Sequence, residues 1–89
     1  MLVDFFAEWC GPCKMMPPVL KELKEVMQDE VTILKIDVDK NRQVANTYQI
    51  QSVPTLIVFQ DGEIKWRQSG VASANQLQQV VQRLTNKVQ

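Results

Sequence analysis

The sequence contains no histidine, and this absence excludes several kinds of catalysis. Without histidine the chain has no Ser/His/Asp triad, no Cys/His nucleophile pair, no histidine metal ligand and no histidine pH switch. The two cysteines cannot complete a closed tetrahedral zinc site made from cysteine and histidine. Any chemistry must therefore come from cysteine, carboxylate, lysine or tyrosine side chains.

Net charge and long apolar runs are also lacking. Ten Lys and Arg balance ten Asp and Glu, so no overall electric field attracts nucleic acid or anionic lipid. No apolar run approaches the roughly 20 residues that span a membrane, and the run over 2–7 lacks the basic leader and the length of a signal peptide. We expect a soluble, cytoplasmic protein with no nucleic-acid or membrane partner, although residues upstream of the given start could carry an organellar address.

The alternation of apolar and polar segments predicts one α/β domain over residues 1–89. Strands buried on both faces are expected over 2–7 and 55–59, and a strand rich in β-branched residues is expected over 31–38. A helix is expected over 12–27, with a kink where Pro17 and Pro18 each remove a backbone hydrogen bond, and a short polar helix or turn over 39–48.

The last third of the chain predicts a hairpin followed by a helix. Asp61-Gly62 is a hairpin signal, and the alternation after it predicts an antiparallel edge strand with Ile64 and Trp66 on one face. A capping box at Ser73–Gln76 opens the helix. Its apolar stripe consists of Leu77, Val80, Val81, Leu84 and Val88.

Cys10 and Cys13 lie where the first strand meets the first helix. Their spacing of three within a helical turn brings the Cα atoms to about 5–6 Å, which suits a disulfide that opens and closes with little backbone movement. Backbone N–H groups and the positive end of the helix dipole favour a thiolate there. We expect Cys10, at the exposed end, to be the nucleophile and Cys13, one turn further in, to be shielded.

Two other readings of the cysteine pair are less favoured. A purely structural disulfide would enclose only Gly11 and Pro12, and so short a loop constrains the unfolded chain very little. A two-cysteine metal site of the metallochaperone kind is disfavoured by Pro12 between the cysteines, Trp9 before them and the lack of a third ligand. We therefore expect redox chemistry and no metal.

Several motifs together resemble the thioredoxin family. The segment Asp4–Lys14, DFFAEWCGPCK, resembles the family's active-site segment, and Val53-Pro54-Thr55 resembles its cis-proline loop. Pro18, Lys35, Asp61-Gly62 and Gly70 also stand at family-like positions, so the resemblance covers the whole chain. It implies a thioredoxin-like α/β fold, in which helices flank a central mixed sheet of about four strands.

The resemblance also implies an enzyme that reduces protein disulfides. Cys10 would attack the substrate disulfide and Cys13 would resolve the mixed disulfide, leaving a Cys10–Cys13 bridge. No cofactor is implied besides this redox-active disulfide. The implied partners are disulfide-containing proteins and a thioredoxin reductase that restores the dithiol.

Asp4 is the next candidate catalytic residue. A carboxylate within an apolar strand loses solvation when charged, so its pKa should be raised toward neutrality. The family assigns proton exchange with the buried cysteine, here Cys13, to the matching aspartate, and Lys35 would be the charged partner that tunes it. The alternative is an aspartate satisfied by backbone N–H groups at a strand end.

The resemblance implies a shallow apolar surface for substrates around the cysteines. The Val53 backbone would pair with an extended substrate strand next to a cis Pro54. The expected contact residues are Trp9, Gly11, Pro12, Val53, Pro54, Gly70 and Val71. For Trp9, packing in the core is the competing interpretation.

The chain departs from the family at its start, because the family has a further strand and helix before the strand that begins here at Leu2. We expect an N-terminally truncated fold in which the edge of strand 31–38 is open. Lowered stability, or a dimer or swapped assembly through that edge, should follow. The alternative function is a truncated thioredoxin-fold interaction module that binds partners without turnover.

Overall fold

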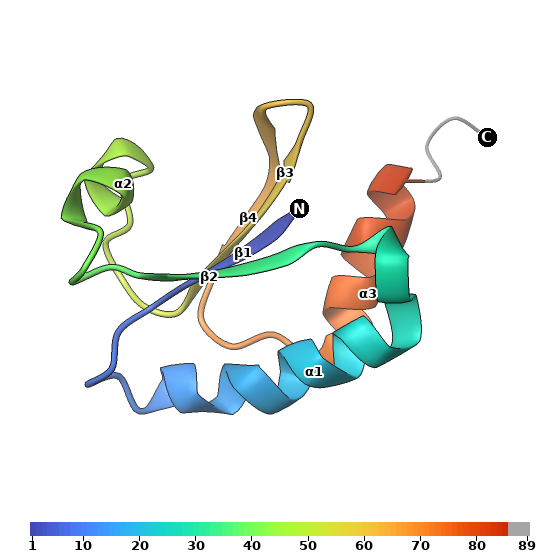
Figure 1. Ribbon diagram of the computed structural model, residues 1–89, viewed down its shortest axis with the longest axis horizontal. Coiled ribbons are helices and arrows are strands. Elements are labelled where there is room, and N and C mark those ends of the chain that lie inside the picture. The colour runs from blue at the N-terminus through green and yellow to red at the C-terminus, as the bar shows by residue number, and fades with distance from the viewer. Residues whose placement is uncertain (86–89) are drawn as a thin grey trace.

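Figure 1 shows a computed structural model of the chain, in which residues 1–85 are described. Within these residues, four strands form one sheet, and three α-helices and two short 3-10 helices surround it. In chain order the elements are β1 (Leu2–Phe6), η1 (Pro12–Met15), α1 (Met16–Met27), η2 (Gln28–Glu30), β2 (Ile33–Asp37), α2 (Arg42–Thr47), β3 (Thr55–Gln60), β4 (Glu63–Ser69) and α3 (Ala74–Thr85).

The sheet is mixed and has the strand order β2-β1-β3-β4. β1 pairs in parallel with β2 and antiparallel with β3, while β3 pairs antiparallel with β4. The near-continuous apolar sequence of β1 follows from this arrangement, because a central strand covered on both faces buries successive side chains. The expected mixed sheet of four strands flanked by helices is confirmed.

Different helices pack on the two faces of the sheet. α1 and α3 pack on one face, in a core cluster that contains Leu2 and Leu56, and α2 lies on the opposite face near Val3 and Phe5 (Figure 1). Because side chains alternate along a strand, Asp4 of β1 shares the α1 face with Leu2. The sheet thus directs Asp4 toward the helix that follows the cysteines.

The helical segment after the cysteines differs from the expected single helix. Pro12–Met15 forms a 3-10 helix, and α1 begins only at Met16. Pro17 and Pro18 therefore lie in the first turn of α1, where N–H groups have no intrahelical partner. The expectation that each proline removes a helical hydrogen bond was wrong for this reason.

The hairpin confirms the expected antiparallel edge strand. The expectation that Ile64 and Trp66 lie on the same face of this strand was wrong. A β-bulge shifts the register between Val58 and Phe59, so Trp66 stands opposite Val58 and Ile64 opposite Phe59. The extra residue reverses the alternation of side chains across the bulge. Trp66 packs against the α1 and α3 cluster, whereas Ile64 is 43% exposed.

The capping residue of α3 is confirmed, since the N–H of Gln76 donates to the Ser73 hydroxyl at 3.1 Å. Leu77 and Val81 are buried in the core cluster, with Val80 and Leu84 packed against it. Val88, the fifth residue of the expected stripe, lies outside the described residues.

Candidate active site

Three loops meet at one end of the sheet, and the cysteine pair lies among them. The segment after β1 carries Cys10, whose Sγ lies 3.6 Å from the carbonyl oxygen of Val53 in the segment before β3. The segment after β4 joins this group, because the N–H of Gly70 donates to the carbonyl of Pro54 at 2.8 Å. The fold therefore brings together residues up to 60 positions apart in the chain.

Cys10 and Cys13 are joined by a disulfide, with their Cα atoms 5.3 Å apart. This separation agrees with the expected 5–6 Å. The N–H of Cys13 donates to the Sγ of Cys10 at 3.1 Å. A hydrogen bond of this kind favours the thiolate form of Cys10 when the bridge is open.

The expected exposure of Cys10 was wrong. Cys10 is 3% exposed and Cys13 is 5% exposed, so both are shielded in the disulfide form. Cys10 is buried because it packs with Ala7 and Cys13, and partly buried Phe6, Val38 and Val53 cover this cluster. The Cys10 sulfur faces Val53, which belongs to the neighbouring loop. The sequence around Cys10 does not reveal this contact.

Trp9 stands at the rim of the site and is 72% exposed. Its indole Nε1 donates to Asp39 Oδ2 at 2.8 Å, which fixes the ring against the segment that follows β2. The competing interpretation of Trp9 as a core residue is therefore wrong. Asp39 was missed by sequence reasoning, because a polar residue after a strand looks the same whether or not it holds a distant side chain.

The other expected contact residues belong to the three loops described above. The Val53–Pro54 peptide bond is cis, as the resemblance implied. Pro54 is buried and Val53 and Gly70 are partly buried, whereas Gly11, Pro12 and Val71 are exposed. Gly70 has a φ of 96°, a conformation that favours glycine. Of these residues, Val53 packs against the cysteine cluster.

Asp4 is 2% exposed, and its Oδ1 has no hydrogen-bond partner among the described residues. Burial raises the pKa of Asp4 from 3.8 to about 6, and the positive charge of Lys35 lowers it by a smaller amount. Lys35 stands directly opposite Asp4 in the β1–β2 register and is exposed. The alternative of an Asp4 satisfied by backbone N–H groups was wrong for Oδ1.

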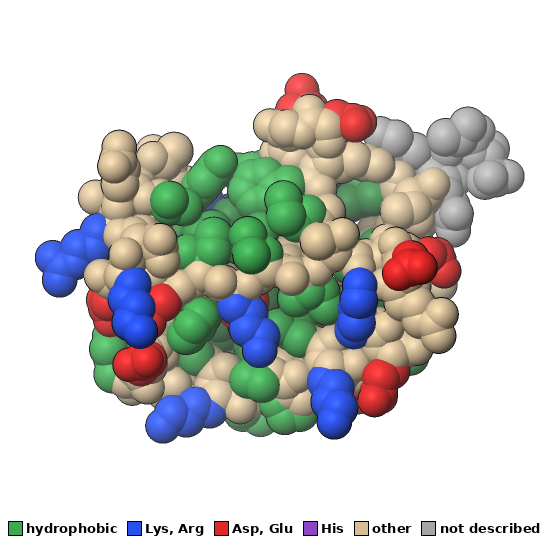
Figure 2. All heavy atoms as spheres, in the orientation of Figure 1, with side chains coloured by type: hydrophobic (Ala, Val, Ile, Leu, Met, Phe, Trp, Pro, Cys, Tyr) green, Lys and Arg blue, Asp and Glu red, His purple; other side chains and the backbone are tan. Residues whose placement is uncertain are grey.

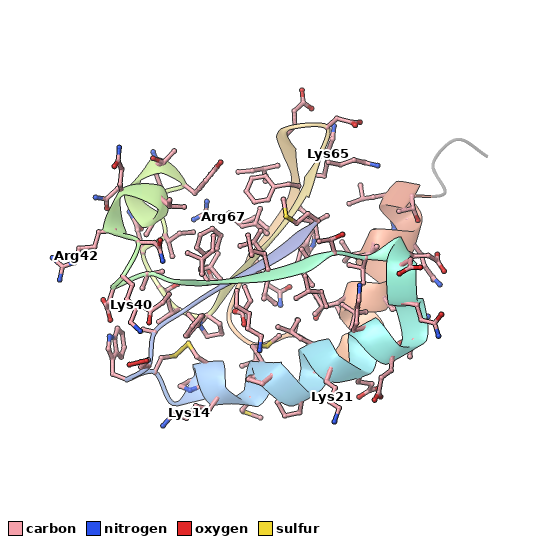
Figure 3. All side chains as sticks on the ribbon, viewed as in Figure 1. Lys14, Lys21, Lys40, Arg42, Lys65 and Arg67 are labelled. Atoms are coloured by element: carbon pink, nitrogen blue, oxygen red, sulfur yellow. A yellow bond between two sulfur atoms is a disulfide. The ribbon has the colours of Figure 1, made fainter. Side chains whose placement is uncertain are left out.

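Arg67 is a second residue that sequence reasoning missed. Its guanidinium donates to the carbonyl oxygens of Tyr48 and Gln49, the latter at 2.8 Å. Figure 3 shows the labelled Arg67 side chain on the side of the sheet where α2 lies. Gln49 has a φ of 54° and directly precedes the segment 50–54 that carries the cis proline. Arg67 thus ties β4 to the start of that segment. From the sequence it was only a polar residue on the solvent side of an edge strand.

Residues 1–85 contain no group of three or more cysteine, aspartate and glutamate side chains arranged to hold a metal ion. In the same part of the chain, no helix is both long enough and apolar enough to cross a membrane.

Comparison with known proteins gives consistent matches. A protein-family model described as Thioredoxin matches residues 1–83. Thioredoxin Y2, a chloroplastic protein of Arabidopsis thaliana, is 46% identical over the whole chain, which spans 52% of that protein. Thioredoxin of Bacillus subtilis is 48% identical over 91% of the chain, which spans 78% of it. The chain thus spans about half of the chloroplastic relative and over three quarters of the bacterial one.

Solved structures show the same similarity. The crystal structure of a chloroplastic thioredoxin z matches 96% of this chain and 77% of its own, with a TM-score of 0.87 and 35% identity. A mutant thioredoxin from Halobacterium salinarum matches 91% of this chain and 70% of its own, with a TM-score of 0.83 and 41% identity.

Proposed function

The chain belongs to the thioredoxin family, and from this premise we propose that it reduces protein disulfides by thiol–disulfide exchange. The observation that carries the proposal is the Cys10–Cys13 disulfide beside Val53, with the N–H of Cys13 donated to the Cys10 sulfur. Such a pair can accept and release two electrons within one turn of backbone. Residues 1–89 would act as one domain.

The proposed reaction begins with the reduced dithiol. The Cys10 thiolate attacks one sulfur of the substrate disulfide, a mixed disulfide forms, and the other substrate sulfur leaves as a thiolate. Cys13 then attacks the Cys10 sulfur and releases the second substrate thiolate. The substrate gains two electrons, the enzyme disulfide is formed, and the two protons of the enzyme dithiol pass to the substrate thiols.

Asp4 is proposed to accept the proton of Cys13 and return it. The support is its raised pKa of about 6, because a carboxylate with that pKa exchanges protons near neutrality more readily than an ordinary aspartate. Lys35, opposite it on β2, would keep that pKa from rising further.

The substrate is proposed to bind over the shallow surface around the bridge. An extended segment that pairs with the Val53 backbone would place its disulfide near Cys10 Sγ, which lies 3.6 Å from the Val53 carbonyl oxygen. The remaining contact residues would be Trp9, Gly11, Pro12, Pro54, Gly70 and Val71. Apolar contact there would shield the mixed disulfide from water.

A thioredoxin reductase is the proposed electron donor, and disulfide-containing proteins are the proposed substrates. The cytoplasm is the proposed compartment. The relatives include both chloroplastic and bacterial thioredoxins. The dimer or swapped assembly expected through the 31–38 edge stays a prediction.

The test is reduction of insulin disulfides by the purified chain in the presence of dithiothreitol, followed by turbidity. The Cys10→Ser variant from a matched preparation is the control, and circular dichroism establishes that both are folded. We expect activity from the chain and none above background from the variant. A folded chain without activity would contradict the proposal and favour the interaction module without turnover.

A further inference from the structure

Arg67 of β4 caps the end of α2 from outside the helix. Its two terminal nitrogens donate to the carbonyl oxygens of Tyr48, the C-cap residue of α2, and Gln49, the residue after it. The last carbonyls of a helix have no partner within the helix, so these two bonds complete its end. Their donor is charged, which makes such bonds stronger than those between neutral groups.

Gln49 occupies the position after the C-cap, where helices commonly end with a glycine in the left-handed conformation. Its φ of 54° lies in that region, which is unfavourable for a residue with a Cβ atom. The Gln49 N–H donates to the Asn46 carbonyl at 3.0 Å. The N–H of Ile50 donates to the Ala45 carbonyl at 2.9 Å. This pair of bonds depends on the left-handed residue between them, and the Arg67 bond to the Gln49 carbonyl favours that conformation.

The segment 50–54 runs from this turn to β3 and carries the backbone that faces the disulfide. Its far end is held because the N–H of Gly70, directly after β4, donates to the Pro54 carbonyl at 2.8 Å. Its near end is held by the turn that Arg67 caps. Val53 lies between the two ends, and its carbonyl oxygen is 3.6 Å from the proposed attacking sulfur. Both ends of the segment are therefore fastened from β4 and the residue after it.

We propose that Arg67 is a positioning residue that makes the site selective for disulfides with an extended main chain beside them. The inference rests on the proposed function, in which a substrate strand pairs with the Val53 backbone. Such pairing needs a donor and an acceptor held in fixed places, so a looser turn at Gln49 weakens it. A small disulfide without a main chain forms no such pairs. Arg67 thus favours peptide and protein disulfides over small ones.

Charge on the displayed face does not provide this selectivity. Figure 2 shows basic and acidic side chains interspersed over the face that it displays. The whole chain carries ten basic and ten acidic residues, so its net charge is zero. A surface of this kind has no strong field of one sign to attract a substrate. Main-chain pairing at a fixed segment is the more specific source of recognition.

The test measures how fast the reduced chain, freed of reductant, reacts with two disulfides. One joins two peptides of about eight residues, and the other is 2-hydroxyethyl disulfide, which has no peptide bond. Alkylation of the remaining thiols and mass spectrometry give the second-order rate constants. We expect Arg67→Gln to react about fivefold more slowly with the peptide disulfide and at the same rate with the small one. Lys65→Gln, on the same strand, should react with both as the unaltered chain does.

The two substrates separate positioning from stability. A variant that is only less stable has a smaller folded fraction, which slows both reactions by the same factor. Circular dichroism measures that fraction for every variant. Arg67→Lys keeps the charge but cannot bond both carbonyls with a planar fork, so it should slow the peptide reaction alone by about twofold. This variant keeps the test valid if Arg67→Gln fails to fold.

A second substitution tests the route through Gln49. Glycine adopts the left-handed conformation without help, so Gln49→Gly combined with Arg67→Gln should react with the peptide disulfide within about twofold of the unaltered chain. Asp61 has a similar φ of 56° in the β3–β4 turn. Asp61→Gly combined with Arg67→Gln is therefore the matched control and should recover nothing.

Three results would overturn the inference alone. They are an equal slowing of both substrates by Arg67→Gln, an unchanged peptide reaction in that variant, and equal recovery by Gln49→Gly and Asp61→Gly. A folded, unaltered chain that reacts with neither disulfide would instead overturn the proposed function, and this inference with it.

Discussion

Asp4 and Lys35 stand opposite each other on neighbouring parallel strands, and only Asp4 is buried. Burial raises the pKa of the carboxyl to about 6, and the lysine limits the rise. Two opposing effects therefore set the pKa of Asp4, and separate substitutions can distinguish them.

We predict that Asp4→Asn stabilises the fold at neutral and higher pH. Below about pH 4 the carboxyl is protonated in both the folded and the unfolded chain, so its burial does not lower the unfolding free energy. As the pH rises from about 4 to about 6, the unfolded chain ionises more readily than the folded one, and the cost of burying Asp4 grows to its full value. The pKa of Asp4 rises from 3.8 to about 6, and each pKa unit corresponds to about 1.4 kcal/mol. Asp4→Asn should therefore gain about 2–3 kcal/mol of unfolding free energy.

Urea denaturation at about pH 4 and about pH 8 measures this gain. The difference between Asp4→Asn and the unaltered chain should be present at the higher pH and nearly absent at the lower one. Asp29→Asn, at an exposed position in η2, is the matched control and should change stability little at either pH. Equal stability of Asp4→Asn and the unaltered chain at both values would show that Asp4 titrates as an ordinary aspartate.

We predict that Lys35→Gln raises the pKa of Asp4 further. Removing a positive charge that favours the ionised carboxylate leaves burial unopposed. An NMR titration of the Asp4 side-chain ¹³C signal should show its midpoint move upward from about 6. Lys65→Gln on β4 removes the same charge at the other edge of the sheet and should leave the midpoint in place. A downward movement in Lys35→Gln would contradict the assigned role of Lys35.

Most of the fold could be predicted because its signals are local. The apolar run over Leu2–Phe6 and the Ser73 cap each show in a few consecutive residues. The faces of Ile64 and Trp66 could not be predicted in this way, because the bulge that separates them is a property of the pairing between β3 and β4. Alternation in one strand cannot show an extra residue relative to its neighbour.

The same distinction between local signals and contacts of distant segments applies to the site. The Cys10–Cys13 spacing is fixed by one turn of backbone, so the sequence predicted their Cα separation. The burial of Cys10 depends on Val53, which is 43 positions away. The bonds of Arg67 to the Tyr48 and Gln49 carbonyls span 19 and 18 positions. Contacts between distant segments leave no repeating pattern in the chain.

We predict that Arg67→Gln weakens substrate binding more than it slows the chemical step. The variant loses two charge-assisted hydrogen bonds that hold the segment leading to Val53 and Pro54. KM for insulin should rise with kcat little changed, and the unfolding free energy should fall by roughly 1 kcal/mol. Lys65→Gln on the same strand is the control. Equal losses in kcat and in kcat/KM would instead place Arg67 in the chemical step.

The two cysteines have different proposed roles, so their serine variants should fail at different stages. Cys13→Ser keeps the attacking sulfur and lacks the resolving one, so a mixed disulfide between Cys10 and the substrate should accumulate. Cys10→Ser should form none, because it lacks the proposed attacking sulfur and keeps only the proposed resolving one. Mass spectrometry under non-reducing conditions, with a peptide disulfide as substrate, measures the adduct. An adduct on Cys10→Ser but none on Cys13→Ser would reverse the assignment and make Cys13 the nucleophile.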